Sequence, residues 1–266
     1  MEPNFESLCN EAISLIRQTG NFIREERANH PLTIETKGKN DFVTHIDKGS
    51  EERLVKGLKT LLPESGFIAE EATSTEKGER FNWVIDPIDG TTNFIHGLSP
   101  FAISVALMDA QEVVIGIVYE MGLDEMFFAW KGSKAYLNGK EISVSSRPTV
   151  ADSLIATGFP YTQYHRMGDF MKTLDHFMRK SHGLRRLGSA ATDLAYVACG
   201  RFEGFYEYNL NPWDVAAGAF IVQQAGGKNA DFTGGNNYIF GKEIISANPL
   251  IFDEFLRDIK LFMEEK

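Results

Sequence analysis

Two aspartates three residues apart, Asp86 and Asp89, are the side chains of this sequence best suited to chemistry. They flank Pro87, and the apolar residues Val84 and Ile85 before them are typical of a buried strand. Because proline fixes φ and ends a strand's hydrogen-bond ladder, the turn can bring both carboxylates toward one point. Adjacent carboxylates repel each other when ionised, so either their pKa values rise or a cation binds between them. Oxygen ligands without a histidine or cysteine beside them favour Mg²⁺ over zinc.

The segment that follows, Gly90 to Asn93, suits an anion. A glycine followed by two threonines and an asparagine is typical of a helix start, where several backbone N–H groups can face outward together. Placed directly after paired metal ligands, such a cap would let a cation and backbone amides hold one phosphoryl group from two sides. For an isolated Asp-Gly-Thr, an Asx-turn between a strand and a helix is the more common explanation. The whole segment from Trp83 to Phe94 favours the phosphate site.

The hydrophobic pattern indicates the elements that must position these residues. Apolar residues recur every three or four positions over residues 4–27 and over residues 48–62, up to Pro63, which predicts two amphipathic helices. Short, apolar, β-rich runs predict strands at residues 66–69, 81–86, 101–108, 113–119 and 125–130. The strand at 66–69 would deliver Glu70 at its end, and residues 137–140 carry the signal of a hairpin turn.

After residue 146 the pattern changes to alternating strands and helices, which indicates an α/β second half. Strands are predicted at residues 153–157, 202–208 and 243–246. Helices are predicted at residues 167–180, 190–199 and 215–225, and from 250 to the end. Because no low-complexity linker separates the two halves, we expect them to share one core.

Composition argues against several classes of function. The 37 acidic and 27 basic residues give a formal charge of −10, which disfavours nonspecific attraction to nucleic acid or to an anionic membrane. The first residues lack the basic start and apolar run of a secretory signal, and no segment is apolar enough to span a bilayer. Cys9 and Cys199 show no metal-type spacing and are expected to be small buried hydrophobes. We therefore expect a soluble protein of the reducing cytoplasm.

Four sequence elements, in order, resemble the inositol monophosphatase family of Mg²⁺-dependent, lithium-sensitive phosphatases. Residues 86–93, Asp-Pro-Ile-Asp-Gly-Thr-Thr-Asn, match the family signature without a departure. Residues 211–218, Asn-Pro-Trp-Asp-Val-Ala-Ala-Gly, continuing to Gln-Ala-Gly-Gly at 224–227, are similar to its C-terminal motif. Residues 37–47 resemble its N-terminal element, and residues 67–71, Phe-Ile-Ala-Glu-Glu, resemble its acidic strand end.

The resemblance implies a mixed α/β (α+β) fold, a layered αβαβα sandwich of the inositol monophosphatase and fructose-1,6-bisphosphatase type. An N-terminal α+β half, residues 1–146, would carry most metal ligands. A C-terminal α/β half, residues 147–266, would carry Asp214 and the substrate contacts, and the two would form one compact unit. A homodimer is the family expectation.

The resemblance also implies a ligand set for two or three Mg²⁺ ions. Glu70, Asp86 and the main-chain carbonyl of Ile88 would hold the ion that activates water, and Glu70 would act on that water through the metal. Asp86, Asp89 and Asp214 would hold a second ion near the leaving-group oxygen. Taken alone, Glu70 is more typical of a solvated strand end and Asp214 of a helix N-cap, but the family match reverses both interpretations.

By the same resemblance, Thr91 would position or deprotonate the attacking water, with Asp47 oriented onto its hydroxyl. Taken alone, Asp47 is typical of the N-cap of a helix that begins near Lys48. The amides of Gly90 and Thr91, with Thr92 beside them, would cradle the phosphate. No covalent phosphoenzyme is required.

Recognition of the alcohol is expected on the C-terminal side. Small residues at a predicted helix start would let a polyhydroxy ring approach the backbone, and they resemble the family's substrate-lining element: Gly188, Ser189 and Ala190. Glu207 aligns with a family glutamate that accepts hydrogen bonds from inositol hydroxyls. Arg185 and Arg186 would contact a second phosphate or lie at an interface, and the enrichment of arginine at interfaces favours the second.

The implied reaction is hydrolysis of a small phosphorylated polyol or sugar, with myo-inositol-1-phosphate as the first candidate. Fructose-1,6-bisphosphatase, histidinol-phosphatase and 3'-phosphoadenosine nucleotidase activities of the same superfamily remain open. A regulatory protein-binding role also remains open, because some bacterial members of this family bind transcription machinery. Nothing in the acidic composition favours that role.

Overall fold

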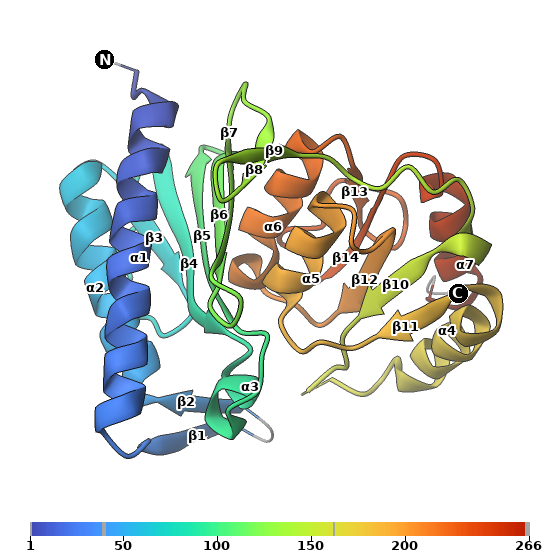
Figure 1. The fold of residues 1–266 in the computed structure, drawn as a ribbon, viewed down its shortest axis with the longest axis horizontal. Coiled ribbons are helices and arrows are strands. Elements are labelled where there is room, and N and C mark those ends of the chain that lie inside the picture. The colour runs from blue at the N-terminus through green and yellow to red at the C-terminus, as the bar shows by residue number, and fades with distance from the viewer. Residues whose placement is uncertain (1, 39–40, 162, 264–266) are drawn as a thin grey trace.

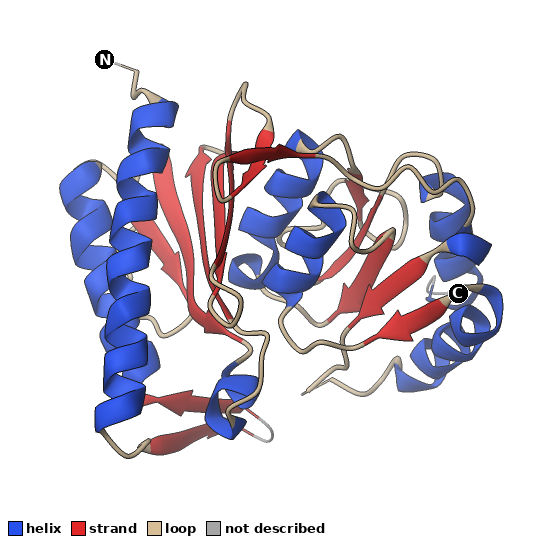
Figure 2. Ribbon diagram, in the orientation of Figure 1, coloured by secondary structure: helices blue, strands red, loops and turns tan. Residues whose placement is uncertain are grey.

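The structure is a computed structural model that describes residues 2–38, 41–161 and 163–263, and the side chains of all of these except residues 36–42. Two large sheets alternate with three layers of helices (Figures 1 and 2). The layers form the αβαβα sandwich implied by the resemblance, so the mixed fold class is confirmed. Within the N-terminal motif, Asn40 lies outside the described residues.

The first layer is the helix pair α1 (Phe5–Asn29) and α2 (His45–Leu61). A short antiparallel hairpin, β1 (Ile34–Gly38) and β2 (Asp41–Thr44), connects them. Both helices pack on one face of the larger sheet through buried apolar residues that include Ile16, Leu54 and Trp83. This packing holds α2 against the strands that carry the acidic residues.

The larger sheet has seven strands in the order β3-β4-β5-β6-β7-β8-β9. They are β3 (Gly66–Ala69), β4 (Phe81–Asp89), β5 (Ala102–Asp109), β6 (Glu112–Glu120), β7 (Glu125–Trp130), β8 (Ala135–Leu137) and β9 (Lys140–Ile142). β3 pairs with β4 in parallel, so the ends of these two strands meet at one edge. Asn138 and Gly139 have φ of 49° and 80° and form the β8–β9 turn, which confirms the predicted hairpin.

The central layer consists of α5 (Ala190–Ala198) and α6 (Pro212–Gln224), between the two sheets (Figure 1). Gly116 in β6 lets α6 approach closely, because a Cβ at this position would lie 2.6 Å from the Ala217 carbonyl oxygen. Gly218 has the same effect between α6 and α5, where a Cβ would lie 2.6 Å from Leu194 Cβ. The tight packing of α6 therefore depends on a glycine, which has no side chain, at each of its two contacts.

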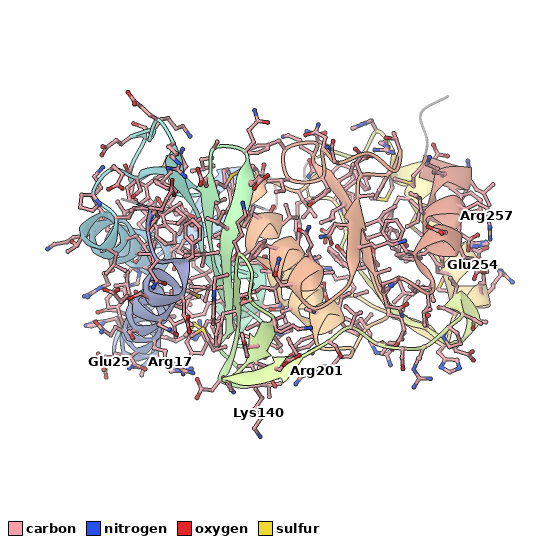
Figure 3. The ribbon with its side chains drawn as sticks, turned by 90° about the horizontal axis from the view of Figure 1, so that it is seen from above. Arg17, Glu25, Lys140, Arg201, Glu254 and Arg257 are labelled. Carbon is pink, nitrogen blue, oxygen red and sulfur yellow. The ribbon has the colours of Figure 1, made fainter. Side chains whose placement is uncertain are left out.

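The smaller sheet has five strands in the order β11-β10-β12-β14-β13. They are β10 (Leu154–Thr157), β11 (Gly183–Arg185), β12 (Gly204–Tyr208), β13 (Lys228–Ala230) and β14 (Glu243–Ala247). Helices α4 (Met167–Lys180) and α7 (Phe252–Met263) cover its outer face through an aromatic-rich cluster that includes Phe177, Tyr206 and Phe255. Seen from above, the layers stand side by side, with the charged side chains of Glu25, Lys140 and Arg257 at the periphery (Figure 3).

The predicted elements are present within the described residues, and the departures are short; residues 264–266 of the predicted last helix lie outside the described residues. Strands β1, β2, β11 and β13 were not predicted, because segments of three to five largely polar residues form only through their neighbours in a sheet. Cys9 is buried in α1, as expected, and Cys199 is half-buried at the end of α5. Within the described residues, no helix is long and apolar enough to cross a membrane.

Candidate active site

The C-terminal end of β4 carries Asp86, Ile88 and Asp89. Its register with β5 shifts between the two aspartates, and the Ile88 amide donates a hydrogen bond to Asp86 Oδ1 at 2.9 Å. The strand was predicted to end at Pro87, but it continues to Asp89 through this irregularity. Proline is tolerated there because a bulged position needs no ladder hydrogen bond.

The third aspartate, Asp214, reaches the site from the start of α6. The cap of this helix is Asn211, whose amide donates to the Asp214 carboxylate at 2.6 Å. The helix therefore begins three residues earlier than predicted, and Asp214 is its third residue and not its N-cap. Ser104 Oγ of β5 donates to the Trp213 carbonyl at 3.0 Å, which ties the start of α6 to the strand beside β4.

Asp86, Asp89 and Asp214 converge, with one carboxylate oxygen of each lying within 4.8 Å of the others. Burial, and then the nearby Glu70, raise the pKa of Asp86 well above its ordinary value. Burial, and then Asp89, do the same to the pKa of Asp214. The pKa of Asp89 rises to about 6 through burial, although the Ser189 hydroxyl and the Ala191 amide each donate to its carboxylate at 2.7 Å.

This cluster fits a hard divalent cation. Its side-chain donors are carboxylate oxygens, and the mutual repulsion that raises their pKa values would be relieved by positive charge at their centre. Glu70 lines the same cavity, and its amide donates to the Ile85 carbonyl at 3.2 Å, which extends the β3–β4 pairing by one residue. The structure thus brings Glu70 to the same cavity as the three aspartates, the grouping that the family resemblance implies.

Asp47 lies behind Thr91. Helix α2 begins at His45, because Thr44 is its cap, so the prediction that Asp47 is the N-cap is wrong. Asp47 instead closes the capping box by accepting hydrogen bonds from the Thr44 amide at 2.9 Å and hydroxyl at 2.5 Å. Its other oxygen lies 3.3 Å from Thr91 Oγ1, which also lies 3.0 Å from the Ile88 carbonyl oxygen. The predicted Asp47–Thr91 contact is therefore present.

A cavity of about 260 Å³ opens beside the carboxylates. The predicted site residues line it, with the exception of Asp47. Those on its wall are Glu70, Asp86, Ile88, Asp89, Gly90, Thr91, Thr92, Gly188, Ser189, Ala190, Glu207 and Asp214. The two halves of the chain meet here closely, since a Cβ on Gly90 would lie 3.0 Å from the Gly188 carbonyl oxygen.

Glu207 forms part of the cavity wall. It is 7% exposed, and burial raises its pKa to about 8 against the opposing effect of Arg186. A Cβ on Gly158 would lie 2.0 Å from its carboxylate, so this carboxylate occupies the space that a side chain at residue 158 would fill. The absence of that side chain leaves Glu207 room to face the cavity.

Sequence reasoning missed the aromatic part of the cavity wall. Phe159 and Tyr161 follow β10, and the Arg186 guanidinium lies 5.3 Å and 5.4 Å from the centres of their rings. Arg186 also donates to the Tyr161 hydroxyl. The enrichment of arginine at interfaces favours an interface for the arginine pair, but Arg186 lines the cavity, while Arg185 is exposed. The only available signal was the position of residues 158–161 directly after a predicted strand.

We expect metal-free protein to lose stability relative to an Asp89→Asn variant as the pH rises from about 4 to about 6. The folded state holds the Asp89 proton up to a pKa of about 6, against an ordinary value of 3.8. Over this window the unfolded state releases the proton first, so stability is lost as the pH rises. Urea unfolding of both proteins in EDTA across this range measures the difference, and parallel pH profiles would contradict the burial effect.

Comparisons with known proteins give a consistent result. The sequence model of the inositol monophosphatase family matches residues 4–261. The Nus factor SuhB of Escherichia coli (strain K12) is 37% identical over 256 residues, which cover 95% of this chain and 96% of that protein. The inositol-1-monophosphatase of Mesorhizobium japonicum is 36% identical over 230 residues, or 86% of each chain. The crystal structure of extragenic suppressor protein suhB from Bartonella henselae superposes with a TM-score of 0.90 at 37% identity, over 96% of this chain and 98% of that one.

Proposed function

Because the chain belongs to the inositol monophosphatase family, we propose that it hydrolyses a small phosphate monoester, with myo-inositol-1-phosphate as the leading substrate. The observation that carries the proposal is the convergence of Asp86, Asp89 and Asp214 on one cavity. The volume of about 260 Å³ suits a small ligand.

The residues that would hold Mg²⁺ are the three aspartates, Glu70 and the carbonyl of Ile88. When bound, Mg²⁺ would neutralise the developing charge on the phosphoryl oxygens and make water a stronger nucleophile. The raised pKa values of Asp86 and Asp214 support this assignment, because they report negative charge gathered in a buried place. We propose that two or three Mg²⁺ ions bind at each site.

Thr91 is the residue that would orient the attacking water. Its single hydroxyl proton can be donated to Asp47 at 3.3 Å or to the Ile88 carbonyl at 3.0 Å. The hydroxyl oxygen is then left to accept a hydrogen bond from water in the cavity. Asp47 would act through Thr91, because its carboxylate is held by Thr44 and does not reach the cavity wall.

The phosphate would lie against the chain that starts α3 (Thr91–His96). Gly90 precedes it with φ of 96°, a left-handed conformation that favours glycine. In our proposal the amides of Gly90 and Thr91 donate to phosphate oxygens, and the Thr92 side chain assists. The closeness of Gly90 to the Gly188 carbonyl would keep this backbone in place.

The alcohol would be recognised by Glu207 and by the small residues Gly188, Ser189 and Ala190. With a pKa of about 8, the Glu207 carboxyl is largely protonated at neutral pH and can both donate to and accept from a hydroxyl group. This favours a polyhydroxy alcohol. Ser189 would serve mainly to hold Asp89, to which its hydroxyl donates at 2.7 Å.

We expect phosphate release to require Mg²⁺ and to stop in EDTA. The measurement is a panel of myo-inositol-1-phosphate, fructose-1,6-bisphosphate, histidinol phosphate and adenosine 3',5'-bisphosphate, assayed side by side with and without Mg²⁺. Inositol phosphate should give the highest kcat/KM, and a clear preference for another ester would replace the substrate while keeping the reaction. Full activity in EDTA would refute the metal mechanism.

A second candidate function comes from the name of a relative. The Escherichia coli protein that is 37% identical to this chain is called a Nus factor, which supports a role with transcription machinery. An Asp86→Asn protein separates the two candidates, because it should lose hydrolysis and keep its outer surface. A transcription partner retained by this variant, together with no phosphatase activity of the wild type on the panel, would favour the second role.

A further inference from the structure

A buried glutamate outside the predicted site, Glu51, holds the segment that follows β3. It lies in α2 with no exposed surface. One carboxylate oxygen accepts the Glu71 amide at 2.7 Å, and the other accepts the Thr73 amide at 2.8 Å and the Thr73 hydroxyl at 2.7 Å. Glu51 therefore binds three donors from one short segment.

The segment held in this way is the one that leaves the sheet at Glu70. The Glu70 amide donates to the Ile85 carbonyl at 3.2 Å, and the next amide, that of Glu71, donates to Glu51. The chain then turns at Ala72, whose φ is 53°. The amides on both sides of the Glu70 Cα thus have fixed acceptors, one in β4 and one in the side chain of Glu51. These two hydrogen bonds set the direction of the backbone at Glu70.

Helix α2 links this clamp to the other side of the site. Asp47 and Glu51 are four residues apart, so they lie one turn apart on the same face of the helix. Asp47 contacts Thr91, and Glu51 holds the peptide after Glu70. One face of α2, packed beside β3 and β4, thus fixes two separate parts of the cavity wall (Figure 1).

We propose that Glu51 is a positioning residue that aims Glu70 at the metal site, an inference that rests on the proposed function. The hydrogen bonds of Glu51 are made to the segment directly after Glu70, where Glu71 and Thr73 bind its two carboxylate oxygens. All three hydrogen bonds are 2.7–2.8 Å long, so the side chain of Glu51 holds this backbone segment at two points. The clamp touches neither the substrate cavity nor the reacting atoms.

The test is Glu51→Gln, which keeps the shape but replaces one acceptor oxygen with an NH₂ group. In either orientation that NH₂ group faces a backbone N–H donor, so the bond from either the Glu71 amide or the Thr73 amide must be lost, while the Thr73 hydroxyl can turn to accept from the NH₂ group. We expect the dissociation constant of Mn²⁺, measured by electron paramagnetic resonance on the whole protein without substrate, to rise about tenfold or more. The half-activating Mg²⁺ concentration for phosphate release should rise in parallel.

Glu52→Gln is the matched control, because Glu52 is the next residue of α2 and is exposed. It should bind Mn²⁺ as the wild type does. If Glu51→Gln is too unstable to purify, Thr73→Val removes one of the three bonds and should weaken Mn²⁺ binding by a smaller factor.

The outcomes separate this inference from the proposed function. A Glu51→Gln protein, or failing that a Thr73→Val protein, that is less stable yet binds Mn²⁺ with the wild-type constant would overturn the positioning role. A wild-type protein that binds Mn²⁺ but hydrolyses nothing would instead count against the phosphatase assignment. In that case weaker Mn²⁺ binding by Glu51→Gln would still support the clamp.

Discussion

Asp86→Asn and Asp89→Asn proteins are each expected to lose Mg²⁺-dependent phosphate release by about 10³-fold or more. A bound metal contributes several kcal/mol of transition-state stabilisation, and each 1.36 kcal/mol changes the rate about tenfold. Each substitution replaces one of the carboxylates that lie within 4.8 Å of one another with a neutral amide. The effect should appear in kcat/KM for the preferred ester of the panel, measured with saturating Mg²⁺.

When no metal is bound, the Asp86→Asn substitution should increase the stability of the protein, although it should lower the activity. The pKa values of Asp86 and Asp214 are raised because burial and neighbouring carboxylates disfavour their charged forms. Removing one charge relieves this repulsion, so the melting temperature of Asp86→Asn in EDTA should exceed that of the wild type. The rise in melting temperature on adding Mg²⁺ should largely disappear.

Asp175→Asn is the matched control for both measurements. Asp175 lies on α4 and forms an exposed pair with Arg179, and such pairs contribute little to stability. Its activity and its response to Mg²⁺ should equal those of the wild type. An Asp86→Asn protein that keeps both wild-type activity and the Mg²⁺ response would show that the cluster is not the metal site.

The order of the elements and the main cluster of the site could be predicted from the sequence, because both depend on local signals. Apolar periodicity predicts α1 and α2, short β-rich runs predict the central strands, and a contiguous motif places Asp86 beside Asp89. The helix starts were less predictable. At Asp47 and at Asp214 an acidic residue looked like the N-cap, but in both helices the cap lies three residues earlier and the aspartate closes a capping box.

The remaining parts of the site depend on contacts between segments that are distant in sequence. Arg186 lies beside Phe159 and Tyr161, residues more than twenty positions away, and no local pattern links them. Glu51 showed no signal because it sits in a regular amphipathic helix, where a glutamate is usually solvated. Only the position of the segment after β3 gives it a role.

A second large effect is expected from Gly116→Val, which should lower the free energy of unfolding by about 3 kcal/mol or more. The added Cβ would lie 2.6 Å from the Ala217 carbonyl oxygen and close to the Phe220 ring. A backbone oxygen in the middle of a helix cannot turn away, so α6 must move from the sheet. Because α6 carries Asp214, this movement would also separate Asp214 from the two aspartates of β4.

Gly116→Ala adds only the Cβ. It tests whether the packing of α6 on β6 sets the position of Asp214, in a protein that should be less destabilised than Gly116→Val. We expect a smaller loss of stability, measured by urea unfolding, together with a higher Mg²⁺ concentration for half-maximal stabilisation. Gly168→Ala is the matched control, because a Cβ there meets nothing within 4 Å and alanine in a helix is favoured over glycine by up to about 1 kcal/mol. If Gly116→Ala were as stable as the wild type and bound Mg²⁺ equally well, close packing of α6 on β6 would not be what sets the position of Asp214. If Mg²⁺ binding were weaker in Gly116→Ala and unchanged in the control, the absence of a side chain at residue 116 would be required for the geometry of the three aspartates.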